Sequence, residues 1–264
     1  MHPSVFTWLA DANNLEYVKS IYFVMFDQGN NIAINNFMKQ AITAIRNGGV
    51  VDFSYLVIID KSFASNPCLM SVYNKLGGSA TFQSYLKKFD GDFSVANLKL
   101  SANSNIVSTV NAETSPPVNY LIEISFNSNN LNRSSLEIAR TFMHEMIHAE
   151  MFRKLLSLSS TNGEIDVLLL NQMLTQHNYP GLYDYYRRYG VNDMQHEQMA
   201  AHYIENIIDF LKGLDSSLSQ QEYESLAWGG LKGTVAWNSK TGQEKQNIMD
   251  TYNNWKSKAG TSCN

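Results

Sequence analysis

The sequence contains little cysteine and no long apolar run. Its 264 residues include two cysteines, Cys68 and Cys263, and neither belongs to a Cys-x-x-Cys pair. A zinc knuckle is therefore excluded, and a disulfide between the two cysteines is expected only if the protein is exported. The longest apolar run, Ile21 to Phe26, is far shorter than the roughly 18 residues that a transmembrane helix needs. We therefore expect no transmembrane segment.

The sequence also lacks an excess of basic residues and a signal-peptide pattern. The formal net charge is -4 and no basic cluster stands out, whereas nucleic-acid-binding proteins carry a basic face. We therefore expect no nucleic-acid partner. No basic segment followed by an apolar one opens the chain, so no signal peptide is predicted. The sequence does not identify the cellular compartment. A soluble protein, an exported protein and part of a longer secreted chain are all consistent with it. The oligomeric state stays open as well.

The first third of the chain mixes helical and strand patterns. Residues 3–30 are amphipathic, and residues 32–45 carry apolar side chains at helical spacing, which predicts a helix. Residues 50–59 are rich in β-branched and aromatic side chains and predict a strand. Two short helices are expected near 68–75 and 81–88.

Three alternating segments in the middle of the chain predict a small sheet. Residues 96–100 and 105–110 alternate polar and apolar side chains, and residues 118–126 give the strongest strand pattern. The pair Pro116-Pro117 marks a turn directly before that third segment. We expect the three segments to pair as an antiparallel sheet.

The chain after residue 134 has almost wholly helical patterns, separated by glycines. The expected helices cover residues 135–158, 164–175, 182–189, 194–213, 219–228 and 242–257. No internal repeat or low-complexity linker divides the chain. The sequence therefore predicts an α+β fold in one domain, 1–264, with a mixed α/β part over 1–115 and a mainly helical part over 116–264.

One motif in the first of these helices carries chemistry. Residues 144–148 read His-Glu-Met-Ile-His, and side chains four residues apart lie on one face of a helix. His144 and His148 can therefore point at one metal ion, and Glu145 reaches the same side. This is the HExxH arrangement of zinc hydrolases.

Independent signals place this motif on a helix. Ser134 and Glu137 fit a capping box, an apolar stripe follows, and neither proline nor glycine interrupts residues 135–158. The alternative interpretation is an amphipathic helix whose histidines are satisfied by hydrogen bonds. Two histidines and an acid on one side of a largely apolar helix would be costly to bury without a partner, so the metal site is favoured.

A catalytic zinc site usually has three protein ligands and a water, so a third ligand is expected. The remaining histidines are His2, His177, His196 and His202, and His2 lies at the terminus. In a helix over 194–213, His196 projects onto the apolar stripe and His202 onto the polar face. His196 is therefore the favoured ligand, with Glu197 and His177 as the alternatives.

Other segments have possible roles beside the metal. A tyrosine or arginine of residues 181–190 is a candidate for stabilising the oxyanion, although aromatic packing on a helix surface is the favoured explanation for each of them. The strand at 118–126 is a candidate for pairing with an extended substrate if it lies at a sheet edge, and otherwise is an internal strand. Trp237 and Trp255 are expected to pack in the core.

These residues resemble the zincin superfamily. The resemblance covers about residues 118–210, and the run around residues 144–148 looks like the minimal SprT-like metallopeptidases and related uncharacterised bacterial proteins of Bacteroidota. The segments 196–200 and 227–231 are similar to the latter group. The resemblance implies a zinc-dependent peptidase with a small sheet over the active-site helix. The metzincin extension and a basic DNA-binding tail are both absent from the sequence, so a DNA-repair protease is not expected.

The function predicted is hydrolysis of a peptide or protein substrate by a metal-activated water. One Zn²⁺ ion held by His144, His148 and His196 would activate the water, and Glu145 would act as the general base. Two alternatives remain: a zincin-like binding protein with a silent zinc site, and a zinc hydrolase of a non-peptide substrate. The sequence identifies no substrate.

Overall fold

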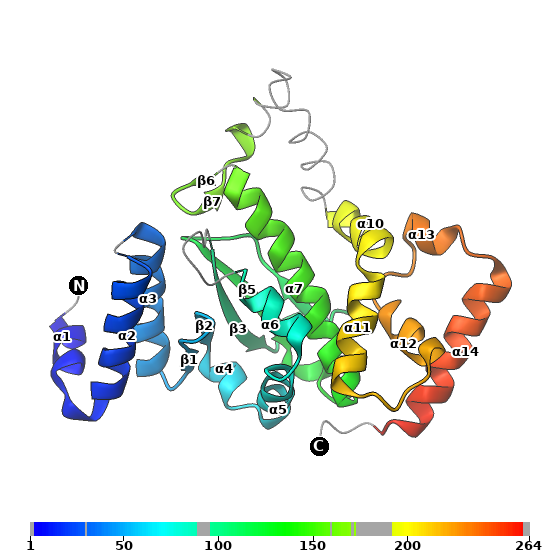
Figure 1. Ribbon diagram of the computed structural model, residues 1–264, viewed down its shortest axis with the longest axis horizontal. Coiled ribbons are helices and arrows are strands. Elements are labelled where there is room, and N and C mark those ends of the chain that lie inside the picture. Colours follow the sequence, from blue (N-terminus) through cyan, green and yellow to red (C-terminus); the bar gives the residue numbers. More distant parts are fainter. Residues whose placement is uncertain are drawn as a thin grey trace.

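A computed structural model describes residues 3–29, 31–88, 96–158, 160–169, 172 and 192–260. Figure 1 shows the N-terminal helices at one end, a sheet in the middle, and the C-terminal helices at the other end. A long helix, α7, runs between the sheet and the C-terminal helices (Figure 1). The α+β fold predicted from the sequence is confirmed, with a mainly helical C-terminal half.

The N-terminal helices are α1 (Pro3–Ala10), α2 (Leu15–Asp27) and α3 (Ile32–Arg46), with a 3₁₀ turn over Ala12–Asn14. Asn31 caps α3 because its side chain accepts the N–H of Ile34. The apolar side of α3, with Phe37 fully buried, packs on one face of the sheet against Ile58. The helix expected over 32–45 is therefore confirmed.

The sheet has five strands in the order β1-β2-β3-β5-β4. They are β1 (Val50–Asp52), β2 (Val57–Ile59), β3 (Asn97–Asn103), β4 (Ala112–Thr114) and β5 (Leu121–Asn127). β2 and β3 are parallel, as are β3 and β5, whereas the outer pairs β1-β2 and β4-β5 are antiparallel.

The expectation of an antiparallel sheet was wrong, because the sheet is mixed. Helical segments connect β2 to β3: α4 (Lys61–Ala64), α5 (Pro67–Leu76) and α6 (Ala80–Leu86). Such a crossover returns the chain in the same direction and makes neighbouring strands parallel. Alternation along a strand predicts its buried side but carries no information on its direction. Cys68, on α5, is disulfide-bonded, and Cys263 lies outside the described residues.

Two strand predictions need correction. The segment 50–59 is two short strands, β1 and β2, joined by a turn in which Leu56 has a positive φ of 51°. The segment 105–110 contains turns and no strand, and its carbonyl groups at Ile106, Val107 and Val110 accept the side-chain amide of Asn127. The side-chain amide of Asn127 supplies the hydrogen bonds that a neighbouring strand would otherwise supply. The alternation of polar and apolar residues over 105–110 therefore does not mark a strand.

Helix α7 (Ser135–Leu158) covers the other face of the sheet and agrees with the predicted range. The capping box is present, since Ser134 Oγ accepts the N–H of Glu137 at 3.3 Å and the Ser134 N–H donates to Glu137 Oε2 at 3.2 Å. Phe142 packs on the sheet with its ring centroid 4.3 Å from that of Phe126. The sheet is therefore held against the helix that carries the motif.

The C-terminal helices lie on the side of α7 opposite the sheet (Figure 1). They are α10 (Asn192–His202), α11 (Ile204–Leu214), α12 (Gln220–Ala227), α13 (Val235–Asn238) and α14 (Gly242–Lys258). The helix expected over 194–213 is two helices, because the backbone leaves helical geometry at Tyr203. Trp237 and Trp255 are buried as expected.

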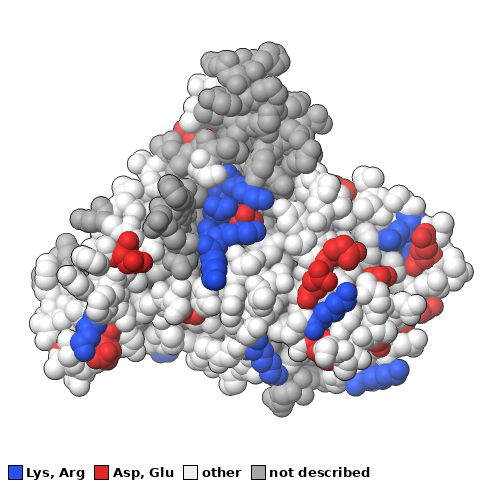
Figure 2. Space-filling view, in the orientation of Figure 1, with Lys and Arg blue, Asp and Glu red and all other residues white. Residues whose placement is uncertain are grey.

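Between α7 and α10 the structure describes a hairpin of β6 (Ser160–Thr161) and β7 (Glu164–Ile165). The helix expected over 164–175 is wrong at its start, where β7 lies, whereas residues 167–169 and 172 are helical as expected. Its other residues, 170, 171 and 173–175, fall outside the described residues, as does the helix expected over 182–189. Of the helices described, none is long and apolar enough to cross a bilayer. Figure 2 shows basic and acidic side chains together on one face of the molecule.

Candidate metal centre

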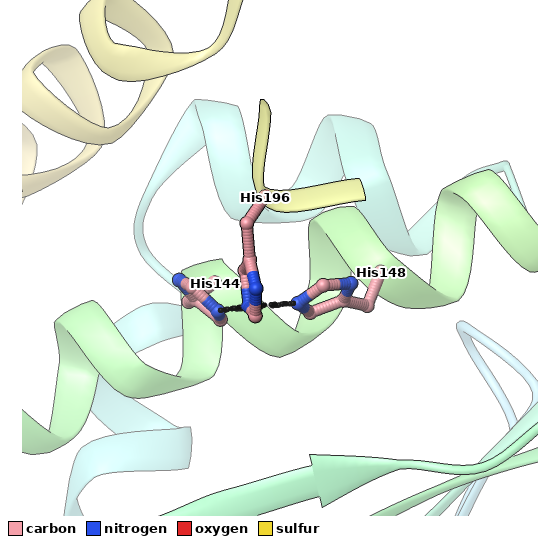
Figure 3. Close-up of side chains that lie close together, drawn as sticks. All are labelled: His144, His148 and His196. Atoms are coloured by element: carbon pink, nitrogen blue, oxygen red, sulfur yellow. Dashed lines mark hydrogen bonds between the residues drawn. The ribbon is translucent and has the colours of Figure 1, made fainter. Parts of the chain in front are cut away.

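Three histidine side chains from two helices converge on one point (Figure 3). His144 and His148 lie one turn apart on α7, and α10 brings His196 against them. The Nε2 atoms of His144 and His148 are 3.2 Å apart, and that of His196 is 3.3 Å from each of them. The two helices thus bring together the three residues that the sequence favoured as ligands.

This triangle of nitrogens has the dimensions of a zinc site. Zn–N bonds of about 2.0–2.1 Å in a tetrahedral shell place two ligand nitrogens about 3.3 Å apart. Mutual hydrogen bonding explains the geometry less well, because three bonds among three nitrogens require at least one nitrogen to be both donor and acceptor, and an imidazole nitrogen is one or the other. The cluster could therefore hold a metal ion.

Electrostatics favour neutral imidazoles at this point. Burial lowers the pKa of His144 well below its usual value, and the neighbouring His148 and Arg140 lower it further. Burial also lowers the pKa of His148, against the opposing hydrogen bond to Gln195. A neutral imidazole keeps a lone pair for a metal ion, so the pocket is suited to a cation at neutral pH.

Gln195 orients one of the imidazoles. Its Oε1 lies 2.6 Å from Nδ1 of His148 and accepts the N–H there, which leaves the lone pair on Nε2. Gln195 is 3% exposed, so the contact is shielded from water. Sequence reasoning missed this residue, since its only signal is its place beside His196. Nδ1 of His144, in contrast, has no hydrogen-bond partner within the part of the chain that the structure describes.

Glu145 lies beside the cluster in the same cavity. Its side chain is buried, and Thr114 Oγ1 donates to its Oε2 at 2.7 Å. Burial raises the pKa of Glu145 to about 7, and the hydrogen bond from Thr114 opposes that rise. A carboxyl group with a pKa near neutrality can both accept and release a proton. Thr114 was not predicted, because only the tertiary structure brings β4 over α7.

Of the alternatives to His196 as the third candidate ligand, the structure describes Glu197 but not His177. Both carboxylate oxygens of Glu197 accept the N–H of Val235, at 2.7 and 3.0 Å, so Glu197 caps α13 and is not part of the cluster. His202 is exposed, which confirms its predicted place on the polar face. His177 and the oxyanion candidates at 181–190 lie outside the described residues.

The cluster opens into a cavity of about 400 Å³. Its lining includes residues of β4 together with Arg140, Phe152 and Gly230. β5 lies between β3 and β4, so the hypothesis that the strand at 118–126 forms the edge of the sheet was wrong. The edge strand beside the cavity is β4.

The chain matches no protein-family model, no curated protein and no solved structure. The zincin-like interpretation therefore depends on the geometry itself: the two histidines four residues apart on α7, the third on α10, and the sheet packed against α7.

Proposed function

We propose that this protein is a zinc-dependent hydrolase of peptide bonds, with His144, His148 and His196 as the ligands of one zinc ion and Glu145 as the general base. The convergence of three Nε2 atoms within 3.3 Å of one another is the observation that carries the proposal. Zinc is the metal that such a site most often uses for hydrolysis without redox chemistry.

When bound, zinc would lower the pKa of a water toward about 7 and polarise the scissile carbonyl. Glu145 would accept a proton from the attacking water at its carboxylate and pass it to the leaving amine, while the oxygen of that water bonds to the carbonyl carbon and the C–N bond breaks. Thr114 holds the Glu145 carboxylate in one orientation by its 2.7 Å hydrogen bond. Gln195 keeps His148 in the tautomer with a free Nε2.

The edge strand β4 supports a peptide as the substrate. Asn111 accepts the N–H of Asn127 and Ser115 donates to Glu123, so alternate residues of this segment point their backbone groups at β5. The backbone N–H and C=O groups of Ala112 and Thr114 therefore face away from β5. An extended peptide can pair with such an edge, and Thr114 would place it beside Glu145.

Metal analysis combined with one variant tests the proposal. The purified protein should contain one zinc per chain, with anomalous scattering locating the ion among the three histidines. Glu145→Gln should keep zinc and lower peptide hydrolysis by about 10²–10⁴-fold, and a chelator should abolish it. Glu205→Gln is the matched control, because Glu205 is exposed on α11.

The outcomes also separate the rival functions. Zinc binding with no hydrolysis of any peptide in a diverse library would indicate a binding protein with a silent site. Chelator-sensitive hydrolysis restricted to esters or other non-peptide substrates would indicate a different hydrolase. Undiminished peptide hydrolysis by Glu145→Gln would refute the mechanism.

The disulfide at Cys68 bears on the compartment in which the protein is located. Disulfides persist in oxidising compartments and are rare in the cytosol, so we propose that the protein is exported. Peptide mapping of the native protein without reduction tests this, because a free Cys68 thiol in protein isolated from its source would contradict it.

A further inference from the structure

Arg140 lines the cavity and forms no ion pair with a carboxylate of the described residues, although the carboxylates of Glu137 and Glu145 act on it from a longer distance. It lies one helical turn before His144 and lines the same cavity. Its Nη1 donates to the carbonyl of Gly229 at 2.6 Å, and within the described part of the chain no carboxylate lies within ion-pair distance of it. Removing a guanidinium from bulk water without an anionic partner is costly, so its place here needs a reason.

The backbone of Gly229 and Gly230 packs against the guanidinium of Arg140, where a counter-ion would otherwise be expected. A Cβ on Gly229 would stand 2.8 Å from Cζ of Arg140, and a Cβ on Gly230 would stand 3.4 Å from its Nη1 and 3.3 Å from Cε1 of His144. Gly230 also has a φ of +85°, which L side chains rarely adopt. The glycine pair therefore lies against both Arg140 and the ring of a metal-ligand candidate.

Most of the donors of Arg140 remain for a ligand. A guanidinium has five N–H donors in a planar fork, and the one hydrogen bond described uses one of them. Nε and Nη2 are not among the fully buried atoms that lack a partner, so they are accessible to solvent, and Arg140 lines the cavity. The neighbouring Arg133 differs, because it donates to Asn130 and Thr141 of the protein itself.

The direction of the edge strand places one end of a bound peptide at Arg140. The start of β5 lies near the end of α7, since Tyr120 N–H donates to Gly163 at 3.0 Å, and its end packs at Phe142. β5 and α7 are therefore antiparallel, and β4, antiparallel to β5, runs in the direction of α7. A peptide paired antiparallel to β4 consequently has its C-terminal end toward Arg140.

The spacing limits how far that end extends beyond the bond that is cut. One helical turn separates Arg140 from His144, about 6 Å along the axis. An extended peptide spans about 3.3–3.6 Å per residue. Resting on the proposed function, we propose that Arg140 binds a substrate carboxylate one or two residues beyond the scissile bond, supplied by the C-terminus of the peptide or by an acidic side chain there.

Three matched peptides test this inference with the zinc-loaded protein. One has a free C-terminal carboxylate, the second is its C-terminal amide, and the third is an amide with glutamate one or two residues beyond the bond cut in the first. The acid should exceed the plain amide in kcat/KM by about 30-fold or more, as expected for losing one partner of a desolvated charge pair. Mass spectrometry of the products should show release of one or two residues. An equal rate for the glutamate amide and the acid would show that a side-chain carboxylate serves as well as the C-terminus, and a rate equal to that of the plain amide would restrict the carboxylate to the C-terminus.

Variants test the role of the guanidinium. Arg140→Gln should reduce the preference for the acid to less than about threefold, and Arg140→Lys should keep part of it, because lysine keeps the charge but loses the bidentate fork. Lys212→Gln, which removes an exposed positive charge on α11, should leave the preference unchanged. The comparison of acid and amide needs no variant, so it stands even if Arg140→Gln fails to fold.

Binding separates this inference from the proposed function. Zinc-loaded Glu145→Gln should bind the labelled acid peptide about 30-fold more tightly than the amide, measured by fluorescence anisotropy. If no peptide is hydrolysed but this difference in affinity appears, the proposed function fails and the role of Arg140 stands. Cleavage of all three peptides at internal bonds with rates within threefold, or equal affinities for acid and amide, would overturn the role of Arg140.

Discussion

The burial of Glu145 makes a quantitative prediction for the metal-free protein. Its pKa is raised from 4.5 to about 7 in the folded state, chiefly by burial. The folded state therefore binds this proton more tightly than the unfolded state, and the resulting stabilisation is present below pH 4.5 and is lost as the pH rises through about 7. A rise of 2.5 units corresponds to about 3 kcal/mol at 1.36 kcal/mol per unit.

Glu145→Gln removes this titration while keeping a side-chain oxygen that can accept the hydrogen bond from Thr114. In a chelator, the variant should be more stable than the wild type by about 3 kcal/mol at pH 8 and by close to nothing at pH 4.5. For a chain of this size the gain at pH 8 corresponds to a rise in Tm of about 6–12 °C.

Urea denaturation at the two pH values, followed by circular dichroism, measures the difference directly. Glu205→Gln provides the control, because its exposed side chain is solvated in both the folded and unfolded states. If Glu145→Gln changed the stability equally at pH 4.5 and pH 8, or lowered it at pH 8, burial of the Glu145 carboxylate would not raise its pKa, and the reasoning would be refuted. A gain in stability of Glu145→Gln at pH 8 would also show that the wild type retains an unfavourable charge at its candidate active site.

Three further predictions concern the ligands and the support of α7. His196→Ala should weaken zinc binding by about two to three orders of magnitude, since one ligand contributes about a quarter of the total binding free energy of a four-ligand site. His202→Ala should leave the zinc affinity unchanged. Competition with a chromophoric chelator measures both affinities, and equal losses would contradict the proposed role of His196. Gln195→Ala should lower zinc affinity by about 10–100-fold in the same assay, and an unchanged affinity would mean that its hydrogen bond to His148 does not matter. Glu137→Ala should destabilise the protein by about 2 kcal/mol in urea denaturation at pH 7, because it removes the N-terminal cap of α7; a loss below about 0.5 kcal/mol would indicate that the cap contributes little.

The destabilisation caused by Glu137→Ala should depend on pH, because the Glu137 carboxylate titrates. Burial by itself raises the pKa of Glu137, but hydrogen bonds from Tyr252, Lys256 and Ser134 outweigh it and lower the pKa below its usual value. A lowered pKa contributes stability that is present above pH 4.5 and is lost as the pH falls toward the pKa of the folded state. The difference between wild type and Glu137→Ala should therefore shrink in acid, and a difference that grows there would contradict the contacts of Glu137.

Local patterns along the chain determined the parts of the fold that depend on neighbours in sequence. The range of α7, its capping box and the shared face of His144 and His148 follow from helical periodicity and from contacts three or four residues apart. The burial of Trp255 and the exposure of His202 follow from side-chain polarity on helices. These features need no knowledge of the remaining chain.

Only the tertiary structure decided how distant segments meet. Strand direction, the break at Tyr203 and the placement of β4 over α7 depend on crossovers and packing, about which alternation in a strand says nothing. Helical projection favoured His196 but left Glu197 open, because both lie near the inner side of one helix. The N–H of Val235, 38 residues away, engages the Glu197 carboxylate. The motif on α7 was thus determined by the sequence itself, whereas long-range packing determined the approach of His196, the contact of Thr114 with Glu145 and the place of Arg140 at the cavity.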